Sequence, residues 1–256
     1  MSLAQRLVKS LAYRCGYTIK RLQAPPATGA TTTSGSRLQA ADLLPALHKV
    51  DPYAGFEFDR YDFDPAGWGS KSPAFAKLIA EQGERLELVI EVGTWKGGSA
   101  IEMAAAIDAA GNDATVLCID TWLGALEFWN DHEDPERYGA LALKNGYPTV
   151  YYQFLANVCH AGHQNRVVPF PQTSATAALW LASRGVRAGL IYVDGSHEEG
   201  DVYADLCAYH ELLAEGGTLF GDDWTWDGVR MAVTRFARER DLEIRHVEDK
   251  WALADA

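Results

Sequence analysis

The chain has 256 residues and a formal net charge of −12, with 48% hydrophobic and 23% charged residues. This length suffices for one sizeable α/β domain with an extension but is tight for two domains. The acidic balance argues against a nucleic-acid partner, because phosphate neutralisation requires a surplus of Lys and Arg. The four cysteines form no CxxC pair and fit a reducing environment. We therefore expect a cytoplasmic globular protein.

The first 22 residues form a basic amphipathic pattern, with Leu3, Leu7 and Leu11 on one helical face and no acidic residue. Two interpretations are open. The helix contacts anionic lipid as a peripheral membrane segment, or it is a solvated terminal helix or a docking arm for a second subunit in a homo-oligomer. The sequence favours the solvated helix or docking arm over the membrane contact. No apolar stretch reaches the roughly 18 residues that a spanning helix needs.

The segment that follows is irregular and then aromatic. Residues 24–36 are rich in Pro, Gly and Thr, which is typical of a flexible linker. Leu38 to Val50 has a helical pattern, and Ser72 ahead of Pro73 is placed to cap another helix. The predicted organisation is a basic helix with linker at residues 1–37, a helical and aromatic lid segment at 38–84, and a cofactor-binding catalytic domain at 85–256.

From residue 86 onward, short apolar runs alternate with helical patterns. A continuous apolar run predicts a strand that is buried on both faces, as in a parallel sheet. The fold class we expect is therefore α/β, a Rossmann-like, doubly wound and mostly parallel sheet with helices on both faces. The expected strands are residues 86–92, 115–119, 167–170, 189–193 and 218–220. The expected helices are one that follows the turn at residues 93–99 and ends at 109, and those at 174–183, 197–213 and 228–240.

Acidic residues mark the ends of the first two predicted strands. Glu91 precedes a turn that contains Gly93, and glycine there lets the backbone approach a ligand at a helix N-terminus. The glycine spacing is not the GxGxxG of dinucleotide enzymes, and Glu91 suits an ammonium better than a pyrophosphate. Asp120 ends the second strand, where an acid can accept hydrogen bonds from ribose hydroxyls. Either acid alone could be a surface charge, but together they favour a nucleoside site.

Three further acids follow the later strands. Asp194 ends one strand, and Asp222 and Asp223 end the next. Because parallel strands end at the same edge of a sheet, these carboxylates should converge and repel one another, and Mg²⁺ would resolve the repulsion. A bound cation would lower the pKa of a coordinated hydroxyl. The alternative for the Asp222–Asp223 pair is a helix cap. His197 is the predicted general base, or else a helix-start histidine bonded to the adjacent loop.

Two stretches carry a family resemblance. "IEVGTWKGGSA" resembles the first motif of class I S-adenosylmethionine-dependent methyltransferases, and "VLCIDTW" is similar to the strand after it. The resemblance implies that the methionine part of S-adenosylmethionine lies against Glu91 and Gly93, the ribose against Asp120, and adenine near Ser174. The implied cofactor-binding residues are Glu91, Gly93, Thr94, Trp95, Ser99, Asp120, Thr121, Trp122, Gln172, Ser174 and Asp194.

The stretch from "LIYVDGSHEEGDVYADL" to "LFGDDW" resembles metal-dependent O-methyltransferases of the macrocin, aminocoumarin-sugar and catechol types, and a subgroup called cephalosporin-hydroxylase-like. The likeness runs from about residue 68 to 236. It implies that Asp194, Asp222 and Asp223 bind the metal and that His197 stands where catechol enzymes have a catalytic lysine. Ser196 departs from the acid that sugar enzymes usually have there. The catalytic candidates are therefore His197 and Asp194, and an unidentified base stays open.

The expected activity is methyl transfer from S-adenosylmethionine to a hydroxyl of a small-molecule acceptor, a sugar or glycoside, assisted by Mg²⁺ or another divalent cation. Two alternatives stay open: a catechol or phenol acceptor, and a non-catalytic S-adenosylmethionine-binding module. A nicotinamide oxidoreductase is disfavoured by the glycine spacing. Aromatic residues that could stack on the acceptor follow the strand-end acids. They are Trp122, Phe128, Trp129, Trp224 and Trp226.

Overall fold

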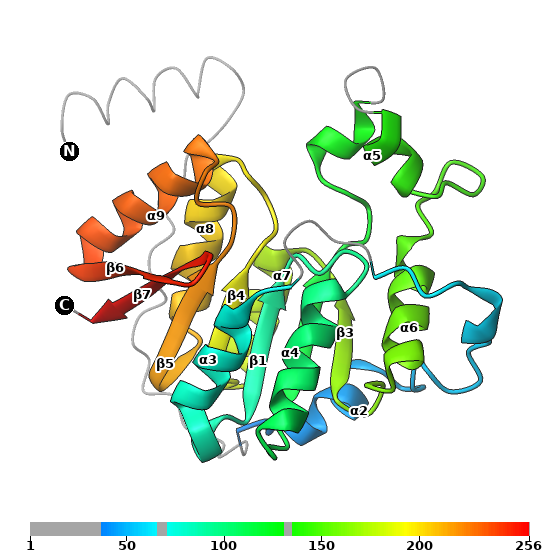
Figure 1. The fold of residues 1–256 in the computed structure, drawn as a ribbon, viewed down its shortest axis with the longest axis horizontal. Helices are drawn as coiled ribbons and strands as arrows, with labels where there is room; N and C mark the ends of the chain where they lie inside the picture. Colours follow the sequence, from blue (N-terminus) through cyan, green and yellow to red (C-terminus); the bar gives the residue numbers. More distant parts are fainter. Residues whose placement is uncertain (1–36, 66–70, 131–134, 256) are drawn as a thin grey trace, which may run out of the picture. The chain divides into compact units, whose positions relative to one another are not determined.

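The apolar runs of the sequence form one seven-stranded sheet (Figure 1). The computed structural model describes residues 37–65, 71–130 and 135–255, so the predicted basic helix and linker lie outside the described residues. The strand order is β3-β2-β1-β4-β5-β7-β6, and the first five strands are parallel. The strands are β1 (Leu88–Val92), β2 (Thr115–Asp120), β3 (Val167–Pro171), β4 (Ala188–Val193), β5 (Leu213–Gly221), β6 (Leu242–Val247) and β7 (Lys250–Asp255).

The doubly wound, Rossmann-like sheet predicted from the sequence is confirmed. Every residue of β1 and β4 is buried, which explains their continuous apolar runs. The chain order reverses between these two neighbouring strands, and such a switch point opens a crevice at the carboxyl ends of the strands. The C-terminal hairpin of β6 and β7 was not predicted; it extends the sheet antiparallel to β5.

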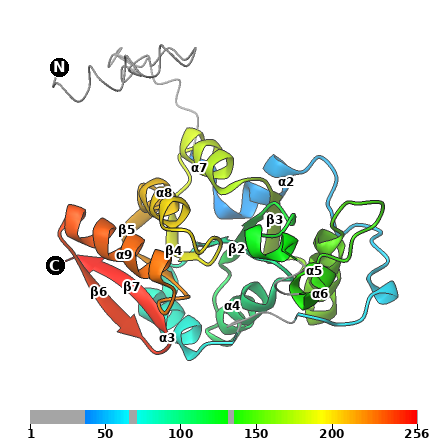
Figure 2. The ribbon, with the colours of Figure 1, turned by 90° about the horizontal axis from the view of Figure 1, so that it is seen from above.

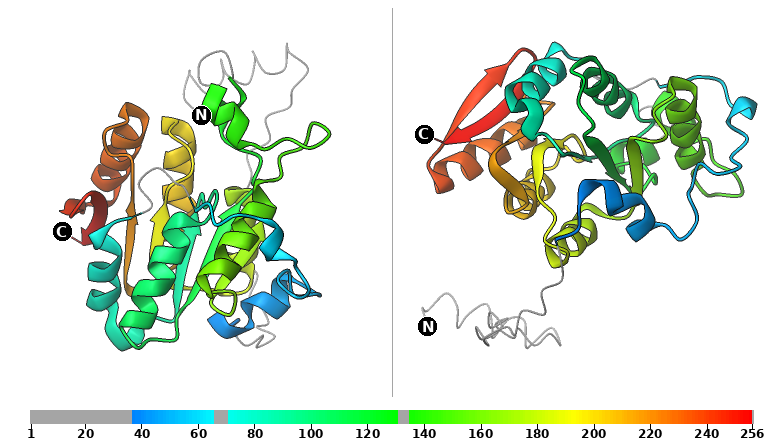
Figure 3. Two further views of the ribbon diagram at one scale, coloured as in Figure 1. Left: turned by 45° about the vertical axis from the view of Figure 1, so that its right-hand side comes forward. Right: turned by 90° about the horizontal axis from the view of Figure 1, so that it is seen from below.

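Helices cover both faces of the sheet (Figures 2 and 3). On one face α2 (Leu43–Leu47), α7 (Ser174–Ser183), α8 (Glu199–His210) and α9 (Asp227–Arg240) pack on the strands. The other face carries α3 (Pro73–Gln82), α4 (Gly98–Ala109) and α6 (Val150–Ala161). The remaining elements are α5 (Pro135–Ala140) and the short 3-10 helices η1 (Ala40–Asp42), η2 (Phe58–Arg60), η3 (Gly83–Arg85) and η4 (Leu126–Trp129).

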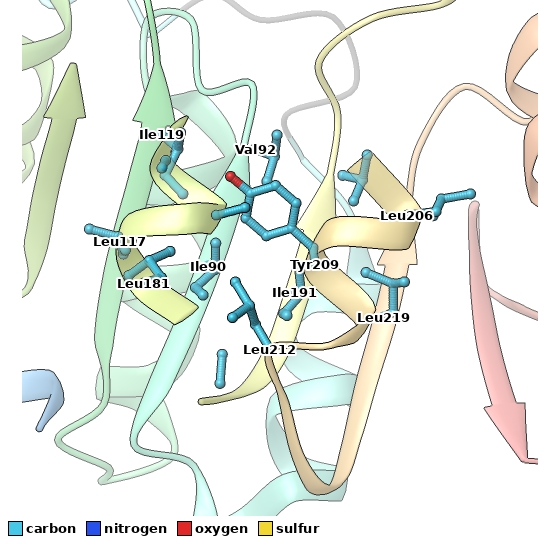
Figure 4. Close-up of a cluster of buried hydrophobic side chains, with 14 of the residues drawn as sticks. Ile90, Val92, Leu117, Ile119, Leu181, Ile191, Leu206, Tyr209, Leu212 and Leu219 are labelled. Carbon is cyan, nitrogen blue, oxygen red and sulfur yellow. The ribbon is translucent and has the colours of Figure 1, made fainter. Parts of the chain in front are cut away.

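Side-chain alternation along the strands divides the core into these two layers. Ile90 and Val92 of β1 point to the face covered by α7 and α8, whereas Val89 points to the opposite layer. Figure 4 shows the first layer, in which Tyr209 lies among leucine and isoleucine side chains of the sheet and helices. This packing fixes the strand tips on which the candidate site is built.

The segment 38–84 differs in part from the prediction. Ser72 caps α3 as expected, with its hydroxyl accepting a hydrogen bond from the Ala74 backbone N–H at 3.1 Å. The predicted helix from Leu38 to Val50 is shorter, because η1 and α2 together end at Leu47. The aromatic side chains of Phe56, Phe58 and Phe63 pack against α6, where Phe58 and Phe63 contact the ring of His160. None of the described residues of this segment lines the cavity described below.

Leu219 tests the packing of this core, because it is fully buried in β5 and pairs with β7. We expect Leu219→Ala to lower the free energy of unfolding by about 2–5 kcal/mol, since the loss of buried surface leaves a cavity. Leu179 on α7, 74% exposed, is the matched control. Leu179→Ala should change stability by less than about 0.5 kcal/mol. Urea unfolding measures both, and equal effects of the two substitutions would contradict the burial of Leu219 in this core.

Candidate active site

A cavity of about 990 Å³ opens at the carboxyl ends of the parallel strands. Its wall is formed by the loops that follow β1, β2, β3, β4 and β5, and by parts of η4, α5 and α8. Cavities that bind small molecules have volumes of about 300–1,000 Å³. This one is at the upper end of that range, so it can hold a nucleoside-sized ligand and a second small molecule together.

Gly93 forms the floor of the cavity where β1 meets β4. Its φ is +87°, and a Cβ at this residue would lie 2.2 Å from the carbonyl oxygen of Asp194. No side chain fits there, so the glycine is required by both its backbone conformation and this close approach. The predicted glycine turn is therefore brought against the tip of β4.

Glu91 lies beneath this floor and does not line the cavity. Its carboxylate accepts hydrogen bonds from the hydroxyls of Thr94, at 2.8 Å, and Ser99, and the Cys118 thiol lies 3.6 Å away. Burial raises the pKa of Glu91 to about 7, although the bonds from the hydroxyls act in the opposite direction. The expected contact between Glu91 and a ligand ammonium needs revision, because this carboxyl instead supports the loop from below.

Asp120 ties the loops after β1 and β2 together. One carboxylate oxygen accepts the backbone N–H groups of Thr94 and Trp95 at 2.9 and 2.8 Å, and the other accepts that of Trp122 at 2.7 Å. Asp120, Thr94, Trp95 and the neighbouring Thr121 all line the cavity. The predicted ribose-binding acid therefore lies in the cavity wall.

Trp122 is placed differently from the expectation. It is buried in the core, where its indole packs against Phe154 and Tyr151, and it does not line the cavity. Its Nε1 donates to the carbonyl oxygen of Trp95 at 2.7 Å, so it supports the loop rather than a ligand. Trp122 and Trp95 both have positive φ, 53° and 51°. Such backbone costs about 1–3 kcal/mol per residue and is concentrated at functional sites.

The far end of the cavity is formed by the start of α7 and by α8. Gln172 and Ser174 line this end as expected, with Ser99 at the start of α4 also in the cavity wall. Sequence reasoning missed Asp205, which faces this end from α8 and is only 8% exposed. Burial raises the pKa of Asp205 to about 6, against a hydrogen bond with Ser174. The sequence pattern that could have revealed Asp205 is its helical spacing from Val202 and Tyr209, which places it on the buried face of α8.

At the opposite end the strand register brings acidic residues together. Val193 pairs with Gly221, so Asp194 and Asp222 leave the sheet side by side. The Tyr192 hydroxyl lies 3.1 Å from an oxygen of Asp194 and 3.4 Å from an oxygen of Asp222. Desolvation, together with the neighbouring acids, raises the pKa of Asp194 well above its usual value. Asp194 lines the cavity, as predicted for a site residue.

Asp222 turns away from the cavity toward a buried cation. Its carboxylate binds the Lys250 ammonium at 2.6 Å and also accepts the Asp223 backbone N–H at 2.8 Å. Lys250 lies on β7, is 1% exposed and makes a second ion pair with Asp249 at 2.8 Å. Burial lowers the pKa of Lys250, but the hydrogen bonds to the two carboxylates outweigh burial and raise it. Lys250 could not be linked to the site from the sequence.

His197 lies in the cavity wall between two carboxylates. Its Nε2 is 2.8 Å from Asp223, and its Nδ1 lies 3.1 Å from Glu127 without hydrogen-bond geometry. The ring stacks on Trp226 with centroids 4.2 Å apart. The hydrogen bond with Asp223 raises the pKa of His197 above its ordinary value, against burial. Glu127 comes from the irregular segment η4, and no sequence pattern predicted its role.

The predicted Mg²⁺ site is not supported by this arrangement. Within residues 37–65, 71–130 and 135–255, no group of three or more His, Cys, Asp or Glu side chains is placed to hold a metal ion. The physical reason is that Asp222 is paired with Lys250 and Asp223 with His197. Only Asp194 among the three predicted ligands has no ion pair with a cationic side chain of the described residues.

The fold and the cavity together define a Rossmann-like α/β protein with a ligand site at the switch point of its sheet. The profile of a family described as "Methyltransferase domain" matches residues 90–224, more than half of the chain. The chain therefore belongs to this methyltransferase family. The matched region runs from β1 to just beyond β5 and includes most of the loops that form the cavity.

Comparison with solved structures gives the same fold. The calicheamicin methyltransferase CalS11 is 18% identical, with a TM-score of 0.53 and coverage of 91% of this chain and 94% of that chain. A putative O-methyltransferase from Klebsiella pneumoniae is 17% identical, with a TM-score of 0.51 and coverage of 85% of this chain and 96% of that chain. An O-methyltransferase from Bacillus cereus in complex with SAH is 13% identical, with a TM-score of 0.50 and coverage of 97% of both chains. No curated protein matches the chain. Among the described helices, none combines the length and hydrophobicity needed to cross a bilayer.

Glu91 provides a pH test of the cavity floor. Its folded-state pKa of about 7 lies above the ordinary value of 4.5, so the folded protein binds the extra proton between these values. Wild-type stability should therefore fall as the pH rises through this window. Glu91→Gln should be more stable than wild type at pH 8 by up to about 3 kcal/mol and similar to it at pH 4.

Urea unfolding at both pH values measures this difference, with the exposed Glu84→Gln as the control. An equal stability difference between Glu91→Gln and wild type at pH 4 and pH 8 would show that Glu91 is not the buried titrating group described here.

Proposed function

We propose that the protein transfers the methyl group of S-adenosylmethionine to a hydroxyl of a small-molecule acceptor. The observation that carries this proposal is one continuous cavity that contains both the Gly93–Asp120 wall and the His197–Asp223 pair. Membership of the methyltransferase family supports the reaction class. When bound, S-adenosylmethionine supplies an electrophilic methyl group on a sulfonium centre.

The residues of the cavity wall fit this cofactor. Ionised Asp120 has about four acceptor positions, and three are taken by backbone N–H groups. The remaining position can accept a ribose hydroxyl. We assign the adenine to the end near Gln172 and Ser174. This leaves the methionine part along Gly93, Thr94 and Trp95.

Asp194 is the proposed partner of the cofactor's ammonium group, in place of Glu91. It lines the cavity directly beside Gly93, whereas Glu91 is sealed beneath the floor. Burial, together with the neighbouring carboxylates, raises the pKa of Asp194, so an ammonium beside it would favour its ionised form. The contact therefore supplies the positive charge that this acid lacks among the described side chains.

His197 is the proposed general base, acting through Nδ1. Asp223 holds Nε2 at 2.8 Å, which fixes the ring, and Nδ1 is buried without a hydrogen-bond partner among the described residues. With the ring neutral and its proton on Nε2, an acceptor hydroxyl that takes the place of Glu127 beside Nδ1 would give up its proton to that nitrogen. Asp223 would then stabilise the imidazolium, as carboxylates do for catalytic histidines.

A sugar or glycoside is the proposed acceptor. The acceptor end of the cavity offers several hydrogen-bonding side chains, among them Glu127, Asn130 and Arg137. A polyhydroxylated ring can use more of these groups than a phenol can. Leu126 and Trp226 are exposed at the same end and could pack on the C–H face of a sugar. A catechol-like phenol is the second candidate, because the same apolar side chains suit an aromatic ring.

Asp120 tests the cofactor assignment. We expect Asp120→Ala to weaken binding of S-adenosylhomocysteine about tenfold or more, because it removes an acceptor for the ribose and the tie between two loops. Calorimetric titration measures the affinity. The control is Asp113→Ala, an exposed acid just before β2 at the other edge of the sheet. Binding of NADH instead of S-adenosylhomocysteine would overturn the proposed cofactor.

His197 tests the chemistry. His197→Ala should lower turnover by about 10²–10⁴, the range for loss of a general base, while S-adenosylhomocysteine affinity is retained. Turnover is measured as S-adenosylhomocysteine release with panels of glycosides and phenols. The exposed His246→Ala serves as the control. Wild-type rates in His197→Ala would exclude the base, and wild-type protein that binds cofactor but methylates nothing in either panel would favour a non-catalytic module.

A further inference from the structure

We propose that this methyltransferase works without a divalent metal, because Asp222 is held by an ion pair with Lys250 and Asp223 by a hydrogen bond with His197, so neither carboxylate is free to bind a cation. The inference rests on the proposed function for its chemistry, but its structural basis is independent of the acceptor. The inference follows from the side chains that bind Asp222 and Asp223, the two acids after β5.

Lys250 is placed as a permanent counter-ion of Asp222. The ammonium lies 2.6 Å from Asp222 and is almost completely buried, with the ring of Phe75 at 5.9 Å. A metal that bound the Asp222 carboxylate would take away a carboxylate partner of this buried ammonium, which also pairs with Asp249. Removing one carboxylate partner from a buried ammonium is unfavourable, because burial has already taken away its hydration. The ion pair therefore competes directly with metal binding.

A second side chain of the hairpin holds Asp222 in the same orientation. Trp251, next to Lys250 on β7, donates its indole N–H to the carbonyl oxygen of Asp222 at 2.6 Å. A Cβ at Gly221 would lie 2.2 Å from this indole, so the ring packs directly on the strand tip. Both the main chain and the side chain of Asp222 are thus fixed by β7, away from the cavity.

Asp223 is held by the imidazole of His197. Its φ of +60° places it in a left-handed turn, and its carboxylate bonds to His197 at 2.8 Å. A Cβ at Gly228 would lie 2.1 Å from the His197 carbonyl oxygen, so the first turn of α9 packs tightly on this loop. Asp194 lines the cavity and has no Lys, Arg or His partner among the described residues, so it is assigned to the cofactor.

The consequence for the reaction is that proton removal depends on the protein's own base. A metal ion would acidify the acceptor hydroxyl by coordination. Here Nδ1 of His197 takes the proton, and Lys250 is a positioning residue that keeps Asp222 paired and out of the cavity. Neither step needs an ion from solution.

The test is a calorimetric titration of chelator-treated, full-length protein with Mn²⁺ and Mg²⁺. Wild type should show no stoichiometric binding. Lys250→Met should raise Mn²⁺ affinity about tenfold or more, because it releases a hard oxygen ligand. Lys250→Arg and the exposed Lys144→Met should leave it unchanged. Turnover of the chelator-treated wild type should be the same with and without added Mg²⁺.

Stoichiometric metal binding to wild type that Asp222→Asn abolishes would overturn the proposal, as would turnover that is lost in chelator and restored by Mg²⁺. The wild-type titration decides the matter even if Lys250→Met does not fold. Because metal binding is measured without turnover, a protein that binds no S-adenosylhomocysteine would refute the proposed function and leave this test intact.

Discussion

The close approach of Gly93 to the carbonyl oxygen of Asp194 is the constraint on which the cavity depends. It joins the tips of β1 and β4, the two central strands where the sheet reverses its order. Asp120 then fastens the loop after β1 to the loop after β2 through three backbone N–H groups. Two rigid junctions thus set the shape of the wall before any ligand is present, and such preorganisation lowers the entropic cost of binding.

Charge compensation determines what the other end of the cavity can do. Asp222 pairs with Lys250, Asp223 bonds to His197, and Glu127 lies between His197 and Arg137. Carboxylates paired in this way are poor ligands for a cation, but they fix the groups that they bind. The imidazole of His197 is held by Asp223 on one side and by stacking on Trp226. In the proposed reaction this rigidity orients Nδ1 toward the acceptor.

Much of the fold followed from the sequence, because β1 and β4 are buried on both faces and carry continuous apolar runs. The meeting of Asp194 and Asp222 also followed from strand polarity alone. Their partners did not, since Lys250 comes from a hairpin whose mixed polar and apolar residues gave no clear strand signal. Trp122 looked like a ligand-stacking residue, yet a loop sequence does not reveal which face of the turn is buried. Glu91 lies inside β1 rather than after it, and a strand that is buried on both faces buries each of its side chains, so the burial of Glu91 could have been predicted.

The most direct test of the account is a crystal structure of the protein with S-adenosylhomocysteine. The account predicts one ligand in the cavity, with its ribose on Asp120, its ammonium on Asp194 and its sulfur directed toward His197. Ligand density outside the cavity, or a ribose that does not contact Asp120, would contradict the claim that these strand tips form the methyl-donor site.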